Sequence, residues 1–284
     1  MIENNFEVVV FGASSLLGKS IIRTNPKNFI YISRKKIDKK NIKWTKLSIN
    51  PKKKITKNKI RTGIFLISPR YTKKNFNKRV YEKEYYFLKK IFKLYNFSKF
   101  VYVSSPTIYQ KKHPIGTIKK KCEKFLIKNS KKLDNLQIWR PYNLVGTDHS
   151  NLSDHFHNLL FKKIFLQKKI NHKFLGCKND ERGYADVDNF IKTLLVKSYK
   201  NISFIKNYGN KKSIKVSKIV EIFNKELFKI SGKSLNVKFL KAQPNKNIIN
   251  RKSKNSIFLN TNNEIIFKKY LKKMFKLHKI IKIK

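Results

Sequence analysis

Apolar and polar positions alternate along the first half of the chain in blocks that predict strands and helices in turn. Short continuous apolar blocks predict strands, and longer blocks with an apolar residue at every third or fourth position predict helices. The predicted strands are 6–12, 28–33, 42–49 (the weakest), 62–68, 99–105 and 136–142. The predicted helices are one from about Leu16, one over 75–96 and one over 114–126. Apolar strands separated by helices are typical of a parallel sheet covered on both faces.

After about residue 150 the pattern loosens into helices and short strands, as is usual for a substrate-binding portion. We therefore predict an α/β fold with a doubly wound parallel sheet in residues 1–150, to which strands return from the later chain. Residues 151–284 are expected to form a smaller substrate-binding region, and 284 residues suffice for this organisation. The basic amphipathic stretch 267–284 is expected to be a solvated terminal helix, with contact to anionic lipid or RNA as the alternative.

The chain has no feature that predicts a membrane span, a signal peptide or a metal site. No apolar run reaches the roughly 18–20 residues that a span needs, and no basic region precedes the first apolar run. Cys122 and Cys177 lack the spacing of a disulfide framework or a metal site, so we expect a cytoplasmic protein. His155 and His157 have a metal-like spacing, but no carboxylate or cysteine frames them, and we expect both in a helix.

The net charge of +52 raises the question of nucleic-acid binding. Only eight of the 68 basic residues are arginine, and the lysines run through every segment without forming one stripe. Together with the many Asn and Ile residues, this distribution favours a compositional bias over a selected polyanion site. We therefore expect no specific nucleic-acid partner.

The segment GASSLLG (12–18) follows the first predicted strand and opens the first predicted helix. A glycine turn in this position presents backbone N–H groups and the positive end of a helix to a phosphate. Ser15 occupies the middle position of the G-x-x-G-x-x-G pattern, where a small side chain still allows close approach. We predict a dinucleotide site there, with a purely structural turn as the alternative. The candidate residues are Gly12, Ser14, Ser15, Leu16, Leu17 and Gly18.

The segment SRKK (33–36) ends the second predicted strand without an acidic residue that could bind a ribose 2′-hydroxyl. Arginine at this place suits a 2′-phosphate, so Ser33 and Arg34 favour NADP, with NAD as the alternative cofactor. The other interpretation of Arg34 is one more exposed cation.

Several further motifs resemble one family when they are taken together in order. They are VVVFGASSLLG (8–18), KFVYVSSPTIY (99–109), IGTIKKKCE (115–123), WRPYNLVG (139–146), RGYADVDN (182–189) and NYGNKKSIKVSKIVEIF (207–223). Each is modest alone, but the set resembles the extended short-chain dehydrogenases/reductases of the NAD-dependent epimerase/dehydratase family. The resemblance covers about residues 6–230 and implies a Rossmann-like fold acting on nucleotide sugars.

The resemblance also implies roles for individual residues. Ser105 matches the catalytic serine, and Lys119 matches the lysine that holds the cofactor ribose and lowers the pKa of a catalytic tyrosine. Pro141 lies in the segment that the family places beside the nicotinamide. The residues implied in substrate binding are Tyr109, Asn143 and Arg182. Asn143 could instead cap a turn, whereas arginine at 182 suits bidentate binding of a diphosphate.

The sequence departs from the family where the chemistry is expected. The position of the catalytic tyrosine, four residues before Lys119, is Ile115, which cannot carry a proton. The segment ISPR (67–70) is bulkier than the small residues usual there, and 46–50 lacks the usual acid. Three accounts stay open: an enzyme with another acid, for which His113 and Tyr109 are candidates, an enzyme that needs only hydride transfer and binding, or a relative without turnover. A loop histidine and a pocket wall are the plainer interpretations of His113 and Tyr109.

We therefore expect an NAD(P)-binding nucleotide-sugar epimerase, dehydratase or reductase of surface-polysaccharide metabolism, with catalysis impaired by the loss of the tyrosine. The alternative is a non-catalytic cofactor- or RNA-binding protein of the same fold. The expected partner is a nucleotide sugar, and a homodimer is the expected assembly.

Overall fold

The chain folds into two compact units in the computed structural model. The residues described are 8–24, 26–33, 43–46, 61–68, 78–110, 113–146, 156–174, 176–241, 256–259 and 262–278. Unit 1 comprises Met1–Pro141 and Asp188–Asn207, and unit 2 comprises Tyr142–Val187 and Tyr208–Lys284. The later chain therefore returns to unit 1 once, with a helix and the beginning of a strand.

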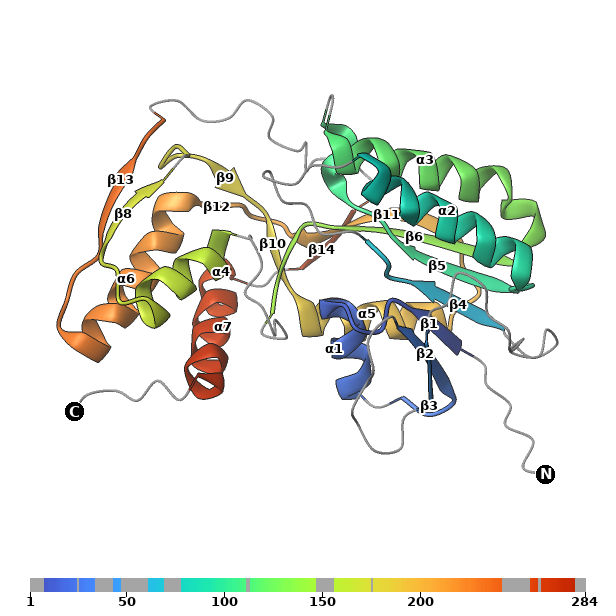
Figure 1. Ribbon diagram of the computed structural model, residues 1–284, viewed down its shortest axis with the longest axis horizontal. Helices are drawn as coiled ribbons and strands as arrows, with labels where there is room; N and C mark the ends of the chain where they lie inside the picture. Colours follow the sequence, from blue (N-terminus) through green and yellow to red (C-terminus); the bar gives the residue numbers. More distant parts are fainter. Residues whose placement is uncertain are drawn as a thin grey trace. The chain divides into compact units, whose positions relative to one another are not determined.

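The main sheet has eight strands (Figure 1). In spatial order they are β14 (Ser256–Leu259), β11 (Phe204–Asn210), β6 (Asn135–Pro141), β5 (Lys99–Val103), β4 (Thr62–Phe65), β1 (Val8–Phe11), β2 (Phe29–Ser33) and β3 (Lys43–Lys46). The six strands from β6 to β3 run parallel to one another. All six strands predicted from the sequence are present, and the predicted Rossmann-like α/β fold is confirmed.

Helices cover both faces of this sheet. The helices of unit 1 are α1 (Leu16–Thr24), α2 (Lys78–Leu94), α3 (Pro114–Lys128) and α5 (Val187–Ser198), with short 3-10 turns η2 (Pro106–Tyr109) and η3 (Ser130–Lys132). Figure 1 shows α2 and α3 on one face and α1 and α5 on the other. Asp188 joins the latter pair, because its carboxylate accepts from Ser20 at 2.9 Å and from Arg23 at 2.6 Å.

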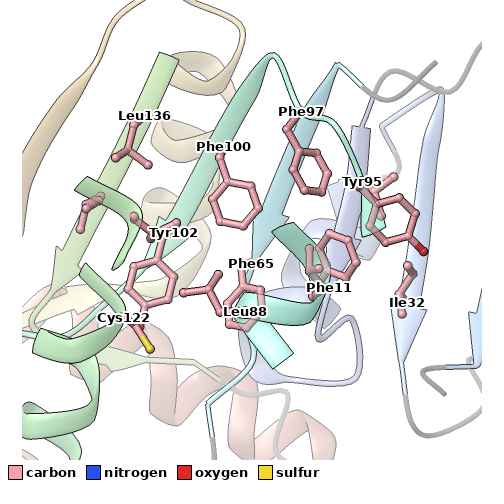
Figure 2. Close-up of a cluster of buried hydrophobic side chains, with 14 of the residues drawn as sticks. Phe11, Ile32, Phe65, Leu88, Tyr95, Phe97, Phe100, Tyr102, Cys122 and Leu136 are labelled. Carbon is pink, nitrogen blue, oxygen red and sulfur yellow. The ribbon is translucent and has the colours of Figure 1, made fainter. Parts of the chain in front are cut away.

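The core between the sheet and α2 and α3 is strongly aromatic (Figure 2). Successive side chains of a strand point to opposite faces, so one face of the neighbouring strands presents Phe11, Phe65 and Tyr102 to the helices. Leu88 of α2 and Cys122 of α3 pack against them. This burial explains why the strands are continuous apolar runs, and it fixes the carboxyl ends of the strands relative to α3.

Unit 2 contains smaller sheets and its own core. Its paired strands are β7 (Asn143–Val145) with β10 (Tyr184–Asp186), β8 (Asn171–Phe174) with β13 (Asn236–Phe239), and β9 (Glu181–Arg182) with β12 (Ile214–Lys215). Its helical segments are α4 (Phe156–Phe161), the π-helical η4 (Lys162–Leu166), α6 (Val216–Ser231) and α7 (Asn263–Leu277).

The terminal helix differs from the expectation of a solvated element. In α7 the side chains of Phe267, Tyr270 and Met274 are buried in the core of unit 2. Their spacing of three and four residues places them on one helical face, while Lys268 and Lys272 lie on the exposed face. Hydrophobic packing therefore holds this helix, and its basic residues form the outer surface.

Within the described ranges, every helix is too short or too polar to cross a membrane.

Candidate functional site

The order of the strands identifies the edge of the sheet at which a ligand would bind. From β3 to β6 the order is 3-2-1-4-5-6, so the direction of winding reverses between β1 and β4. Ligands of open α/β sheets bind outside the carboxyl ends of the strands at this reversal. Because the strands are parallel, the segments that follow β1, β4 and β5 all leave the sheet at this edge.

Gly12 forms the turn that leaves β1. Its φ is +91°, a conformation that side chains with a Cβ rarely adopt. A Cβ at this position would also lie 3.0 Å from the backbone nitrogen of Ile67, in the segment after β4. The amides of Gly12 and Ala13 donate to the carbonyl of Ile32 at 2.9 and 3.1 Å, which fixes the turn. Glycine is therefore required here by both the backbone conformation and the close approach of a neighbouring segment.

Ser15 and Gly18 place the start of α1 against this turn. Ser15 caps the helix, because its Oγ accepts from the amide of Gly18 at 3.1 Å. A Cβ on Gly18 would lie only 2.4 Å from the carbonyl oxygen of Ala13, so the helix and the turn are in close contact. The first amides of a helix lack acceptors within the helix and point toward the space before it. The arrangement has the form of a phosphate site, and the binding of a phosphate here stays a prediction.

The other predicted cofactor residues lie in varied surroundings. Ser14, Leu16 and Leu17 are half-buried in the turn and the first turn of α1. Ser33 is buried at the end of β2, and Pro141 is buried at the end of β6. Arg34 lies outside the described residues, so its contact with a 2′-phosphate stays a prediction.

Ser105 begins the 3-10 turn η2 directly after β5. Its Oγ accepts from the amide of Thr107 at 3.3 Å and from the hydroxyl of Thr107 at 3.0 Å. The side chain is half-buried at the carboxyl edge of the sheet. The structure accounts for Ser105 as the cap of η2, and its predicted catalytic role remains a prediction.

Lys119 is directed into the core of unit 1. Its residue is 3% exposed, and its Nζ donates to Glu84 Oε1 at 2.7 Å and to the carbonyl of Val103 at 2.9 Å. Glu84, on α2, is 1% exposed. The ammonium therefore has a carboxylate partner inside the protein, without any cofactor. The ribose contact implied by the family resemblance stays a prediction. To make that contact, the Lys119 ammonium would have to leave its ion pair with Glu84.

The surroundings of this ion pair keep the neighbouring acidic groups protonated. Tyr102 donates its hydroxyl to Glu84 at 2.7 Å, and its ring lies 5.0 Å from Lys119 Nζ. Burial, together with the charge of Glu84, raises the pKa of Tyr102 well above its usual value. Burial, again with Glu84, raises the pKa of the Cys122 thiol to about 12. The Tyr102 hydroxyl and the Cys122 thiol are therefore neutral groups beside the Lys119–Glu84 ion pair.

Ile115, at the position where the family resemblance implies a tyrosine, lies in the first turn of α3. Its side chain is partly buried and packs against the aromatic core of unit 1. Gly116 follows it, and a Cβ there would lie 2.2 Å from the carbonyl oxygen of Thr107 in η2. The start of α3 therefore lies directly against η2, the turn that carries Ser105 and Tyr109.

A second buried ion pair joins α3 to β6. Arg140 donates from Nε to Glu123 Oε1 at 3.0 Å and from Nη2 to Glu123 Oε2 at 2.5 Å. Ser104 donates to the same carboxylate at 2.5 Å. Burial alone would lower the pKa of Arg140, but the hydrogen bonds and charges of Glu123 and Tyr109 outweigh it, and the pKa is raised. The guanidinium therefore keeps its charge.

The two candidate replacements for the missing acid differ in their surroundings. Tyr109 is 44% exposed, and its hydroxyl accepts from Arg140 Nη1 at 2.7 Å and donates to Asn207 Oδ1 at 3.1 Å. His113 caps α3, since its Nδ1 accepts from the amide of Gly116 at 3.3 Å. Burial lowers the pKa of His113, which favours the neutral ring that this cap requires.

The candidate substrate residues of unit 2 are held by neighbours in that unit. Asn143, exposed on β7, donates its amide to the carbonyl of Gly183 at 2.9 Å. Arg182, half-buried on β9, places its guanidinium 5.5 Å from the centre of the Phe156 ring. Stacking on an aromatic ring orients a planar guanidinium while leaving its donors available.

His157 lies in α4, as expected, and is buried among aromatic rings that include Tyr184 and Tyr270. His155 lies outside the described residues. Among the side chains that the structure describes, His, Cys, Asp and Glu form no group of three or more that could hold a metal.

Two of the buried acids, Glu84 and Glu123, were not predicted from the sequence as parts of ion pairs. A signal was available, because the chain has only 16 acidic residues against 68 basic ones. Glu84 is spaced four and seven residues before the buried Leu88 and Ile91, which places an acid on the apolar face of a helix. An acid in such a position requires a buried partner.

A scan of protein-family models gives no match, and no curated protein matches the sequence.

Solved structures, in contrast, match the fold over almost the whole chain. The UDP-N-acetylglucosamine 4-epimerase of Methanobrevibacter ruminantium M1, in complex with UDP-N-acetylmuramic acid, superposes with a TM-score of 0.73 at 15% identity, over 96% of this chain and 99% of that one. The UDP-glucose 4-epimerase of Thermotoga maritima, with UDP-glucose, gives a TM-score of 0.69 at 16% identity, over 95% and 99%. MoeE5, in complex with UDP-glucose and NAD, gives 0.69 at 12% identity, over 94% and 99%. The chain therefore has the fold of these nucleotide-sugar enzymes.

Proposed function

We propose that this protein binds a nicotinamide dinucleotide at the Gly12–Gly18 turn and a nucleotide sugar, as a relative of the epimerases, dehydratases and reductases of this fold. The observation that carries the proposal is the turn itself. Gly12 has a positive φ, Gly18 contacts Ala13, and α1 begins at the carboxyl edge of the sheet where the winding reverses. These are the physical requirements for binding a pyrophosphate at a helix N-terminus.

The residues of the chain divide between the two ligands. The dinucleotide would lie against the turn and the end of β2, with Arg34 favouring NADP, and with Pro141 near the nicotinamide. Tyr109, Asn143 and Arg182 would bind the nucleotide sugar, with the guanidinium on the diphosphate. A bound nicotinamide would supply a hydride acceptor or donor. Surface-polysaccharide synthesis, a cytoplasmic location, the division near residue 150 and a homodimer remain proposals from the sequence.

A second candidate function is binding without turnover, of a cofactor or of RNA. The observation that favours it is the pairing of Lys119 with Glu84 in the core, next to an isoleucine at the position of the usual tyrosine. In this state Lys119 is paired inside the core, and the side chain at position 115 cannot transfer a proton. The two candidates make the same prediction for dinucleotide binding and differ in turnover.

The choice of cofactor is tested by adding NAD and NADP separately and measuring retained ligand by native mass spectrometry and affinity by calorimetry. We expect tighter binding of NADP, because arginine suits a 2′-phosphate and the segment SRKK (33–36) at the end of β2 contains no acid. Arg34→Ala should weaken NADP selectively, whereas Lys35→Ala should change both affinities little. Equal affinities of the native protein for the two dinucleotides would contradict the preference, and binding of neither would contradict the proposed function.

Gly18→Ala tests the turn. The added methyl would lie 2.4 Å from the Ala13 carbonyl oxygen, so α1 must shift away from the turn. We expect dinucleotide affinity to fall at least about tenfold, which is about 1.4 kcal/mol of binding free energy. Overpacking should also lower the free energy of unfolding by about 1–3 kcal/mol.

Gly232→Ala is the matched control, because it also replaces a glycine with alanine but lies at the end of α6 and not in the Gly12–Gly18 turn. Gly232 has a φ of +66° and open space around its Cβ position, so the exchange costs about 1–2 kcal/mol of backbone strain. We expect unchanged dinucleotide affinity. Equal losses of affinity in the two variants would show that Gly18 acts through general stability alone.

A further inference from the structure

The hydroxyl of Tyr109 is held by two neighbours while its ring remains accessible. Arg140 Nη1 donates to this oxygen at 2.7 Å, and the oxygen donates its proton to Asn207 Oδ1 at 3.1 Å. The guanidinium also lies 5.3 Å from the centre of the Tyr109 ring. The residue is 44% exposed, and the direction of its hydroxyl is fixed by these two hydrogen bonds.

The position of the Arg140 guanidinium is itself fixed by Glu123, so its hydrogen bond to the Tyr109 hydroxyl has a defined direction. Two of its nitrogens are bound to the two oxygens of Glu123, and the remaining Nη1 is the one that reaches Tyr109. Glu123 is 4% exposed and also accepts from Ser104. A planar guanidinium that is anchored in this way presents a fixed positive charge to the phenolic oxygen.

Tyr109 also lies in the corner of unit 1 where the usual acid is missing. It ends the same 3-10 turn that Ser105 begins. The carbonyl of Thr107 in that turn comes so close to Gly116 that a Cβ would be 2.2 Å away, and Gly116 is the neighbour of Ile115. The turn that carries Tyr109 therefore lies against the first turn of α3, where position 115 carries an apolar side chain.

We propose that Tyr109 is the proton-transferring group of this protein, and that Arg140 is the residue that positions it. The assignment rests on the proposed function. In the oxidising direction, Tyr109 releases its own proton to solvent, the O–H bond of a sugar hydroxyl breaks, and the proton of that hydroxyl goes to the Tyr109 oxygen. A nicotinamide held at the Gly12–Gly18 turn would supply the acceptor for the hydride of the adjacent C–H bond, so that the C–O bond would become a carbonyl. In the reducing direction Tyr109 returns the proton.

The test compares the native full-length chain with Tyr109→Phe, which removes only the hydroxyl. The probes are UDP-glucose and UDP-N-acetylglucosamine with NAD or NADP; binding is followed by calorimetry and conversion by reduced-nicotinamide absorbance and by NMR of the sugar. We expect Tyr109→Phe to bind dinucleotide as the native protein does and to bind UDP-sugar somewhat less tightly, while kcat falls by about 10²–10⁴-fold. Tyr86→Phe, at a 64% exposed tyrosine on α2, is the matched control and should leave kcat unchanged.

Each other outcome has a definite meaning. Tyr109→Phe with native kcat would overturn the assignment, and so would a native protein that binds both ligands without converting the sugar. The latter result would leave the proposed binding function in place. A native protein that binds neither ligand would overturn the proposed function, and the role of Tyr109 with it.

The positioning role of Arg140 has its own readout. Arg140→Lys keeps the charge but cannot reach both Glu123 oxygens and Tyr109 with one rigid fork. We expect a lower kcat with little change in KM, and no additional loss of kcat when the exchange is made in the Tyr109→Phe protein. A purely structural role would lower kcat equally in both backgrounds, and that result would overturn the positioning role.

Discussion

Lys119→Met should lower the free energy of unfolding by about 3–5 kcal/mol, because it leaves the carboxylate of Glu84 buried without its ammonium partner. Glu84 is 1% exposed, and Lys119 Nζ is 2.7 Å from its Oε1. The remaining donor to Glu84, the hydroxyl of Tyr102, is neutral and cannot replace a charge. Urea denaturation followed by circular dichroism measures the change.

The double variant Lys119→Met with Glu84→Leu separates the charge from the packing. Both buried charges are then replaced by apolar side chains, and such replacements are often neutral or stabilising. We expect the double variant to recover most of the loss. Lys229→Met, which breaks an exposed pair with Glu226, should change stability by no more than about 1 kcal/mol. A Lys119→Met protein as stable as this control would contradict the importance of the buried pair.

The same double variant tests the role of Lys119 toward a dinucleotide. If Lys119 only pairs with Glu84, replacing both residues should leave the dinucleotide affinity unchanged. If Lys119 instead leaves Glu84 to bind the cofactor ribose, the double variant lacks that contact and its dinucleotide affinity should fall. The comparison therefore decides between the core position of Lys119 and the contact implied by the family resemblance.

Glu123→Ala is expected to have an effect of similar size on the second ion pair. The exchange removes the carboxylate that accepts from Arg140 twice and from Ser104 once, and it leaves a half-buried guanidinium without its counter-charge. We expect a loss of about 3–5 kcal/mol in the free energy of unfolding. Denaturation in urea again provides the measurement.

Glu123→Gln is the conservative variant for this prediction, and Glu226→Ala is its control at an exposed ion pair. The amide of Glu123→Gln keeps the size and one oxygen acceptor but loses the charge. The free energy of unfolding of this variant should therefore lie between those of the native protein and Glu123→Ala. Glu226 pairs with the exposed Lys229, and its removal should cost no more than about 1 kcal/mol. A Glu123→Ala protein that is no less stable than Glu226→Ala would show that the α3–β6 ion pair adds nothing.

Local patterns in the sequence predict the six parallel strands from β6 to β3, the glycine turn and the helices α1, α2 and α3. Apolar runs such as 62–68 and 99–105 predict strands because a residue buried on either face of a covered sheet must be apolar. The glycine at position 12 follows from the positive φ of the turn after β1, and the glycine at 18 from the contact with Ala13. Each requirement acts within a few residues, so it can be recognised without the rest of the fold.

Only the tertiary structure decided what the polar side chains do. The family resemblance predicts Lys119 as a cofactor ligand, whereas the packing of α2 against α3 brings it to Glu84, 35 residues earlier. Tyr109 receives Arg140 and Asn207 from two strands, β6 and β11, the second of which is 98 residues away. Hydrophobic periodicity places a residue on a face, whereas an ion pair or a hydrogen bond requires the position of a second element. Such distances are fixed only when the core is packed, and for that reason the partners of Lys119 and Tyr109 were absent from the sequence pattern.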